Sequence, residues 1–313
     1  MDKKPVIVIC GPTASGKTAL SVELAIALDG EVVSADSMQI YKGMDIATAK
    51  PTKEEMKGIP HHLMSCEEVN RSFSVAEYVA KAKKIIEDIH SRGKLPIITG
   101  GTGLYINSLI DNIKFDETSC CPELREKYLS EAREKGNSFL LEKLREVDPQ
   151  TALELHENNL TRIIRALEVF EVSGVKMSEQ KALSRLEGSP YITCMIGLTF
   201  NDRQKLYERI NCRVDEMVKS GLVDECREVY DNEKLNTACQ AIGYKELIPY
   251  FKGEKTLPEC IDFLKQQTRR YAKRQLTWFR RDERISWIFL DDIISKKEII
   301  NKAKIIIENS SIV

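Results

Sequence analysis

The chain has 313 residues, 42% hydrophobic and 30% charged, so it is long enough for one large domain with an insertion or for two domains. A formal net charge of −1 gives no global signal for nucleic-acid binding and leaves any such signal to local basic clusters. The nine cysteines include no CxxC pair, which argues against a disulfide framework or a zinc site and favours a reducing, cytoplasmic location. No apolar stretch approaches the roughly 20 residues that a membrane helix needs.

The predicted elements alternate between strands and helices. A Val- and Ile-rich strand, PVIVIC, precedes a helix from Lys17 to Leu28. Ser74 and Glu77 have capping-box spacing, which predicts the start of a helix that runs to Arg92. The other predicted strands are Glu31–Ala35, Leu95–Thr99, Tyr191–Phe200 and Ile285–Leu290. Strands separated by helices predict an α/β fold in which helices cover both faces of a parallel sheet, as in P-loop NTPases.

One region breaks this alternation. From about residue 116 to residue 190 the patterns are helical, and no strand is predicted. Asp148-Pro149 has the form of a helix cap followed by proline at the first helical position. We therefore expect a P-loop core formed by residues 1–115 and 191–313, interrupted by a helical insertion domain at residues 116–190.

Residues 11–18, GPTASGKT, match the Walker A spacing G-x-x-x-x-G-K-[ST] between a predicted strand and a predicted helix. The glycines let the backbone fold around an anion, and the N–H groups of the loop and of the helix start supply positive potential. Lys17 adds a mobile positive charge, and the Thr18 hydroxyl can ligate Mg²⁺. The loop therefore predicts diphosphate binding, but it does not identify the group attached to the diphosphate.

Asp36 is the acidic residue that we expect near this loop. It follows the strand Glu31–Ala35, and the carboxyl ends of parallel strands line the ligand crevice. Asp36 alone suits a turn or cap role equally well. An NTPase instead carries a Mg²⁺-binding Asp after a later strand, but Leu95–Thr99 runs into Gly100-Gly101-Thr102-Gly103 without an acid.

Basic residues concentrate near the C-terminus. Residues 269–284 hold seven basic and two acidic residues. The spacing of Arg270, Arg274 and Arg281 predicts that all three lie on one helix face, where they could run along phosphates. A solvated basic helix is the simpler interpretation of the same pattern.

Seven sequence blocks in order resemble those of the bacterial tRNA dimethylallyltransferase family. The blocks span residues 11 to 281 and read GPTASGKT, SADSMQIYKGMDIATAKP, IPHHL, GGTGLY, LTRIIRALEVFEVSG, ACQAIGYKE and RRYAKRQLTWFRR. The resemblance implies that the loop holds dimethylallyl diphosphate with Mg²⁺. It also implies that the exocyclic amine of the adenine on the 3′ side of the tRNA anticodon attacks the allylic carbon, so that diphosphate leaves.

The resemblance also implies roles for individual residues. Asp36 would be the general base, and Lys17 and Thr102 would complete the catalytic set, with Thr18 as the metal ligand. The expected diphosphate-binding residues are Gly11, Thr13, Ala14, Ser15, Gly16, Lys17 and Thr18, together with Arg209 or Arg213, between which the sequence does not decide. A solvated helix face is the alternative for both arginines.

The tRNA anticodon stem-loop would contact two groups of residues. Around the catalytic loop these are Asp36, Ser37, Met38, Gln39 and Thr102, and elsewhere they are Thr161, Arg162, Arg165, Gln240, Gly243, Lys245, Arg270, Arg274 and Arg281. For the blocks at 161–165 and 240–245, ordinary helix surface and turn remain the alternative. Because one chain carries both binding surfaces, we expect a monomer.

Three other functions share parts of this pattern. A P-loop small-molecule or nucleoside kinase would share the core and would turn over ATP. An isopentenyltransferase acting on free adenine nucleotides would share the catalytic loop without needing an insertion that grips tRNA. A non-catalytic RNA-binding protein would bind tRNA without transferring a group.

Overall fold

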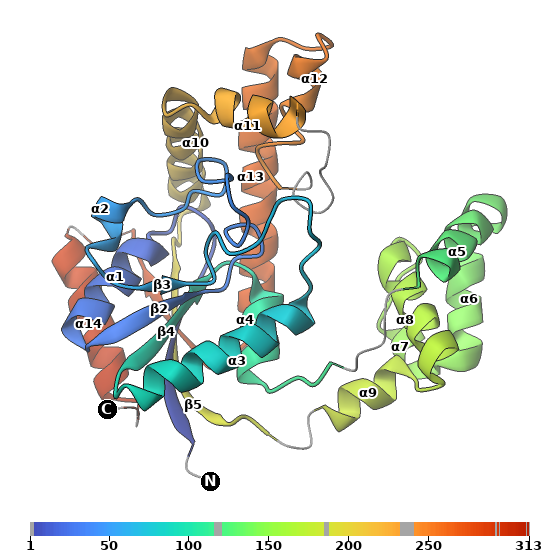
Figure 1. Ribbon diagram of the computed structural model, residues 1–313, viewed down its shortest axis with the longest axis horizontal. Coiled ribbons are helices and arrows are strands. Elements are labelled where there is room, and N and C mark those ends of the chain that lie inside the picture. The colour runs from blue at the N-terminus through green and yellow to red at the C-terminus, as the bar shows by residue number, and fades with distance from the viewer. Residues whose placement is uncertain are drawn as a thin grey trace. The chain divides into compact units, whose positions relative to one another are not determined.

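The computed structural model describes residues 3–115, 121–184, 188–231, 241–291, 293, 295–310 and 312. The chain divides into two compact units, a core of Met1–Ile110 with Pro190–Val313 and an insertion of Asp111–Ser189 (Figure 1). Within the described residues no helix combines the length and the apolar character that crossing a membrane requires.

The described core is built on a six-stranded sheet with the order β3-β2-β4-β1-β5-β6, in which every neighbouring pair is parallel. The strands are β1 (Lys4–Cys10), β2 (Gly30–Ser34), β3 (His61–His62), β4 (Leu95–Gly100), β5 (Tyr191–Thr199) and β6 (Ile285–Phe289). The predicted α/β fold is confirmed. The sequence did not predict β3, because two residues carry no periodicity.

Helices cover both faces of this sheet, with α3 and α4 on one face and α1 and α14 on the other. The helices of the described core are α1 (Lys17–Ala27), α2 (Lys53–Met56), α3 (Val75–Ser91), α4 (Gly103–Ile110), α10 (Arg203–Lys219), α11 (Leu222–Asp231), α12 (Ile248–Phe251), α13 (Leu257–Phe279) and α14 (Lys296–Glu308). The predicted capping box at the start of α3 is confirmed, since Ser74 Oγ accepts from Glu77 N–H at 3.2 Å and the Glu77 carboxylate accepts from Ser74 N–H at 2.9 Å.

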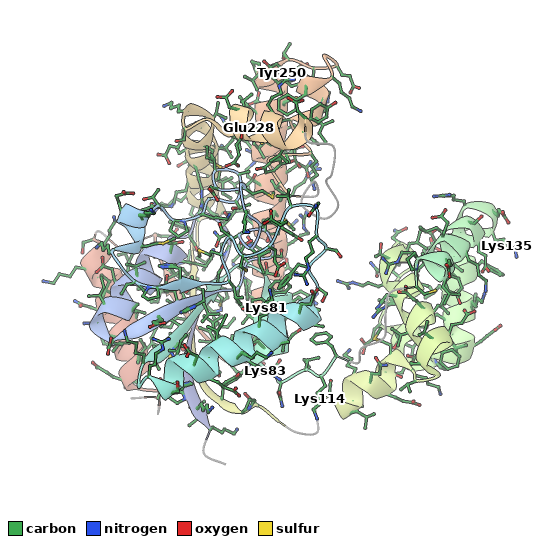
Figure 2. All side chains as sticks on the ribbon, viewed as in Figure 1. Lys81, Lys83, Lys114, Lys135, Glu228 and Tyr250 are labelled. Carbon is green, nitrogen blue, oxygen red and sulfur yellow. The ribbon has the colours of Figure 1, made fainter. Side chains whose placement is uncertain are left out.

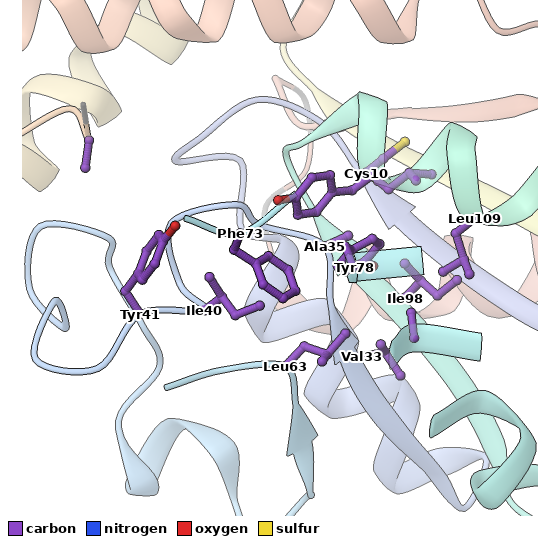
Figure 3. Close-up of a cluster of buried hydrophobic side chains, with 14 of the residues drawn as sticks. Cys10, Val33, Ala35, Ile40, Tyr41, Leu63, Phe73, Tyr78, Ile98 and Leu109 are labelled. Atoms are coloured by element: carbon purple, nitrogen blue, oxygen red, sulfur yellow. The ribbon is translucent and has the colours of Figure 1, made fainter. Parts of the chain in front are cut away.

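The alternating side chains of β1 divide the core into two apolar layers. Val6, Val8 and Cys10 pack with side chains of α3 and α4, including Tyr78, Ile86, Ile106 and Leu109. Figure 3 shows part of this layer around Cys10, Val33 and Ile98. Ile7 and Ile9 pack on the other face with α1 and α14, including Leu20, Leu24, Ala303 and Ile307. Burial on both faces explains why these strands read as continuous apolar runs.

The described part of the insertion is helical, with α5 (Pro122–Lys135), α6 (Asn137–Val147), α7 (Pro149–Leu153), α8 (Leu160–Ser173) and α9 (Met177–Leu183). Figure 2 shows its side chains and labels Lys135 at the end of α5. It has its own apolar core, to which Leu140, Leu144, Ile163 and Leu167 contribute. The predicted cap is confirmed, since Asp148 accepts from Thr151 N–H at 3.0 Å and Pro149 opens α7.

The prediction that Arg281 shares a helix face with Arg270 and Arg274 is wrong. Helix α13 ends at Phe279, with Arg280 as its C-cap. The Arg281 and Asp282 amides then bond to the Trp278 and Phe279 carbonyls in a tightened last turn, and the chain turns toward β6.

Candidate active site

The phosphate loop joins the end of β1 to the start of α1, and two of its glycines have conformations that disfavour other residues. Gly11 has φ of 137°, and a Cβ there would lie 2.4 Å from the Leu198 carbonyl oxygen. Gly16 is the N-cap of α1 with φ of 89° and has no side-chain cap, so the first amides of α1 are not capped by a side chain. The loop therefore offers N–H groups to an anion, as the sequence pattern predicts.

Lys17 is a half-buried cation at the end of this loop. Its Nζ donates to the Pro12 carbonyl at 2.7 Å. Burial, and then the positive charge of Arg213, lower the pKa of Lys17 to about 8, while the nearby Asp36 carboxylate opposes this shift. An anion bound in the loop would restore the stability of the charged form.

Asp36 leaves the end of β2 and faces the same cavity as Lys17 and Thr18. The volume of this cavity is about 270 Å³. Asp36 Oδ1 accepts from the amides of Met38 at 2.9 Å and Gln39 at 3.4 Å, which fixes the carboxylate as in an Asx turn. Within the described residues Oδ2 has no hydrogen-bond partner, so it is available to a ligand. The turn role of Oδ1 therefore leaves Oδ2 open to a second role.

The cavity is polar at the phosphate loop and more apolar away from it. Thr13, Ala14, Lys17 and Thr18 line it at the loop, whereas Gly11, Ser15 and Gly16 do not. Ser15 is buried, and its Oγ donates to the Pro12 carbonyl at 2.9 Å. The apolar lining comes from α10, α11, α13 and two loops, and includes Ala47, Val214, Met217, Leu222, Ile242 and Leu264. Such a cavity suits a ligand with an anionic head and a short hydrocarbon chain.

The two candidate arginines of α10 differ in their surroundings. Arg213 lines the cavity, donates to Thr13 Oγ1 at 3.3 Å and to the Ala49 carbonyl at 3.4 Å, and has a pKa lowered by burial. Arg209 donates to the Ala14 carbonyl at 3.0 Å and is not among the residues that line the cavity. Both contact the phosphate loop, and of the two only Arg213 lines the cavity.

Thr102 holds the segment after β2 that carries Asp36. Its Oγ1 accepts from Ser37 N–H at 3.1 Å, and its own N–H donates to the Ala35 carbonyl at 3.1 Å. Thr102 does not line the cavity, whereas Ser37, Met38 and Gln39 do. The structure therefore places the Thr102 hydroxyl against the segment that carries Asp36.

Several candidate tRNA-binding residues of α13 and of the turn before α12 line the cavity. Arg274 is exposed and lines the cavity, and Arg270 is exposed one helical turn earlier on α13. Gly243 and Lys245 also line the cavity. Gly243 has φ of 114°, and a Cβ there would lie 3.1 Å from Ala47 Cβ, so this glycine permits a close approach. Gln240 lies outside the described residues.

The candidates of the insertion lie on α8. Thr161 and Arg162 are exposed at its first turn. Arg165 is half-buried and pairs with the buried carboxylate of Glu168 at 3.0 Å. Arg162 is therefore better placed than Arg165 to meet an external phosphate.

Sequence reasoning missed Gln275. This buried side chain accepts from Thr13 N–H at 2.9 Å and donates to the Gly101 carbonyl at 3.0 Å, which joins the phosphate loop to the glycine-rich loop after β4. Tyr271, one turn before it, also lines the cavity. The available signal was the spacing of Tyr271, Gln275 and Phe279, which places a polar amide on the inward face of a helix.

The end of β4 does not resemble that of an NTPase. The strand runs into Gly100 and Gly101, which line the cavity without offering a carboxylate, and the acid comes from β2 as Asp36. Among the described residues no cluster of three or more His, Cys, Asp or Glu could hold a metal ion.

Comparisons with known proteins agree with this geometry. A sequence profile of the IPP transferase family matches residues 39–282. The chain is 52% identical over 297 residues to the tRNA dimethylallyltransferase of Caldanaerobacter subterraneus subsp. tengcongensis, with 94% of each chain covered. It is 48% identical over 302 residues to the tRNA dimethylallyltransferase of Bacillus subtilis, covering 95% of this chain and 96% of that protein.

Two solved structures share the fold over nearly the whole chain. The full-length tRNA isopentenylpyrophosphate transferase of Bacillus halodurans has a TM-score of 0.74 and 44% identity, with 99% of this chain and 97% of that chain covered. A eukaryotic dimethylallyltransferase acting on tRNA has a TM-score of 0.84 and 32% identity, with 99% of this chain and 79% of that chain covered.

Proposed function

This chain belongs to the IPP transferase family, and we propose that its phosphate loop and Asp36 together carry out the transfer of a dimethylallyl group to tRNA. The enzyme is a tRNA prenyltransferase. The donor is dimethylallyl diphosphate, and the acceptor is the exocyclic amine of the adenine that follows the anticodon on its 3′ side. The observation that carries the proposal is that Lys17 and Asp36 line one cavity, with no carboxylate at the end of β4.

The donor would place its diphosphate against the amides at the start of α1, with Lys17 and Arg213 as counter-charges. Breaking the bond between the allylic carbon and oxygen leaves both electrons on the diphosphate, whose negative charge rises. Cations already in position stabilise that charge more in the transition state than in the bound donor. The Thr13 amide is engaged by Gln275, so the phosphate contacts fall to the amides of residues 14–18.

Asp36 would take the proton that the adenine amine must lose. The amine nitrogen forms its new bond to the allylic carbon, and the proton passes to Oδ2, which the Asx turn leaves available. The target adenine must leave the anticodon-loop stack to reach this cavity, which costs a few kcal/mol. Thr102 keeps the Asp36 segment in place through the Ser37 amide.

Mg²⁺ fits this site as a partner of the donor. Thr18 and Asp36 present oxygen atoms to the same cavity, and Mg²⁺ is commonly bound through one or two protein oxygens with substrate phosphates supplying others. Thr18 would hold the ion, which when bound would neutralise charge on the departing diphosphate. We expect the enzyme to act as a monomer, since one chain carries both the donor cavity and the candidate tRNA-binding residues. We also expect it to act in the cytoplasm.

A labelled-donor assay tests this proposal. Dimethylallyl diphosphate carrying a label in the prenyl chain is incubated with tRNA, with AMP, or with nucleosides plus ATP. We expect label in tRNA alone. Label in AMP would identify an enzyme of free nucleotides, and ATP turnover without prenyl transfer would identify a kinase.

The variant Asp36→Asn tests the role of the carboxylate. Asparagine retains an oxygen for the Met38 amide but is a poor base, so transfer should fall by about 10²–10⁴-fold while donor binding, measured by calorimetry, stays near the wild-type value. Asp262→Asn on the exposed side of α13 removes the same charge outside the cavity and should leave both unchanged. Wild-type rates in Asp36→Asn would remove this residue from the mechanism.

A further inference from the structure

Glu225 on α11 has an unusually complete set of hydrogen-bond donors. Its Oε2 accepts from the amides of Asp45 at 2.8 Å and Ile46 at 2.7 Å. Its Oε1 accepts from the Ala47 amide at 2.9 Å and from the Tyr244 hydroxyl at 2.8 Å. One half-buried carboxylate therefore binds three successive backbone amides of a distant loop. Figure 2 labels Glu228, one turn further along the same helix.

The loop that Glu225 holds forms a wall of the active-site cavity. Residues 47–49 line the cavity. The side-chain amide of Gln39, close to Asp36 in the chain, donates to the carbonyls of Thr48 at 3.2 Å and Ala49 at 3.3 Å. Arg213 bridges the Ala49 carbonyl and Thr13 Oγ1. The wall is therefore connected to the catalytic loop on one side and to the phosphate loop on the other.

The turn at residues 241–247 packs against this wall from the side of α11. Gly243 has left-handed φ and approaches Ala47 so closely that a Cβ would leave 3.1 Å between the two Cβ atoms. Its N–H donates to Glu246 Oε2 at 2.8 Å, which fixes the turn, and the next residue supplies the Tyr244 hydroxyl to Glu225. Helix α11 and this turn therefore both contact residues 45–47.

We propose that Glu225 is a positioning residue that fixes the 45–49 wall so that the donor meets a preformed cavity. The inference rests on the proposed function, because it assigns the wall to the donor side through its link to the phosphate loop. Glu225 does not line the cavity and so acts through the segment it holds. In its absence three adjacent amides lose their acceptor, and the loop must find other partners or open to water.

The variant Glu225→Gln tests this role in the full-length enzyme. The glutamine amide has one acceptor oxygen, and its NH₂ group would face N–H donors, so the wall loosens while side-chain size is kept. We expect the KM for dimethylallyl diphosphate to rise by about tenfold or more, as for loss of hydrogen bonds to a charged group, with the KM for tRNA within about twofold of wild type. Simple destabilisation would instead lower the active fraction and leave both KM values unchanged.

Asp224→Asn is the matched control. Asp224 lies beside Glu225 in the first turn of α11, so the variant removes the same charge from the same helix end. It is exposed and has no hydrogen-bond or ion-pair partner within the described residues. We expect wild-type KM values. An equal rise in the donor KM for both variants would overturn the proposal, because it would trace the effect to charge rather than to the amide contacts.

Hydrogen exchange gives a readout that does not depend on activity. Amides of residues 45–47 should exchange at least about tenfold faster in Glu225→Gln than in wild type or Asp224→Asn, because exchange requires these hydrogen bonds to open. Tyr244→Phe removes one donor and keeps the three amide contacts, so it should show a smaller increase. Unchanged exchange in Glu225→Gln would overturn this inference, even where the wild-type enzyme transfers the prenyl group to tRNA as proposed. Absence of prenyl transfer by the wild-type enzyme would instead overturn the proposed function.

Discussion

At the scale of single residues, two half-buried cations and one carboxylate line the cavity. Lys17 and Arg213 both have pKa values lowered by burial, and Asp36 opposes the shift in each case. Lys17 Nζ has a carbonyl partner at Pro12, which is a weaker counterpart than an anion. The site is thus built with excess positive charge that a diphosphate would balance.

This arrangement predicts that donor affinity depends on pH through Lys17. With a pKa of about 8, the lysine is charged below that pH and loses its proton as the pH rises further. A bound diphosphate favours the charged form, so affinity should be full below pH 8 and fall by up to about tenfold per pH unit above it. Calorimetric titration with dimethylallyl diphosphate between pH 7 and 9.5 measures this.

Lys17→Met provides the comparison. It should bind the donor weakly and with little change above pH 8, because the titrating group is gone. A wild-type affinity that stays constant from pH 7 to 9.5 would contradict the assignment of Lys17 to the diphosphate.

At the scale of elements, α13 carries the exposed arginines on one side and contacts the phosphate loop on the other. Arg270 and Arg274 are exposed on this helix, while Gln275 on its inner side binds both the phosphate loop and the loop after β4. A Cβ at Gly101 would lie 2.1 Å from Gln275 Nε2, so the two loops and the helix are tightly packed there. The helix therefore sets the spacing of the two loops.

We predict that Gln275→Met weakens donor binding. Methionine has a similar length but leaves the Thr13 amide and the Gly101 carbonyl without their partner, at a cost of about 1–3 kcal/mol. Part of this cost lowers the free energy of unfolding, and part disorders the phosphate loop. The donor Kd, measured by calorimetry, should therefore rise about tenfold. Thr277→Ala, on the exposed side of the same helix, should bind the donor as wild type does. Equal affinities for the two variants would show that the bridge does not order the loop.

The sequence predicts the phosphate loop because all of its determinants are local. A Val- and Ile-rich strand, two glycines and a lysine occur within a few residues, and the capping signals at Ser74 and Asp148 are equally local. Gln275 and Glu225 could not be predicted in this way, since their partners Thr13 and Asp45 lie 262 and 180 positions away. Their contacts depend on how helices pack, which no local pattern encodes.

Arg281 shows the same limit at a helix end. Its spacing from Arg274 is helical, but α13 ends before it because the chain turns toward β6. Arg209 and Arg213 show another limit. Helical spacing places both on one face, and only their tertiary contacts separate the arginine that lines the cavity from the one that does not.

At the scale of the whole molecule, the cavity and the insertion belong to separate units. The residues that line the cavity all come from the core unit, and the insertion has an apolar core of its own. A change on the surface of the insertion should therefore leave the donor site intact. This separation makes the two substrates independently testable.

Arg162 on the insertion is a candidate contact for a tRNA phosphate. It is exposed at the first turn of α8, whereas the nearby Arg165 forms an ion pair with Glu168. If Arg162 contacts a tRNA phosphate, Arg162→Ala should weaken tRNA binding and lower the slope of log K against log salt by about 1, with donor affinity unchanged. Filter binding at several salt concentrations measures the slope. Arg133→Ala on α5 removes another exposed arginine, whose guanidinium lies 3.4 Å from the Glu126 carboxylate, and it serves as the control for net charge. The same loss of affinity in both variants would indicate a diffuse effect of charge, and no loss in Arg162→Ala would remove this residue from the tRNA interface.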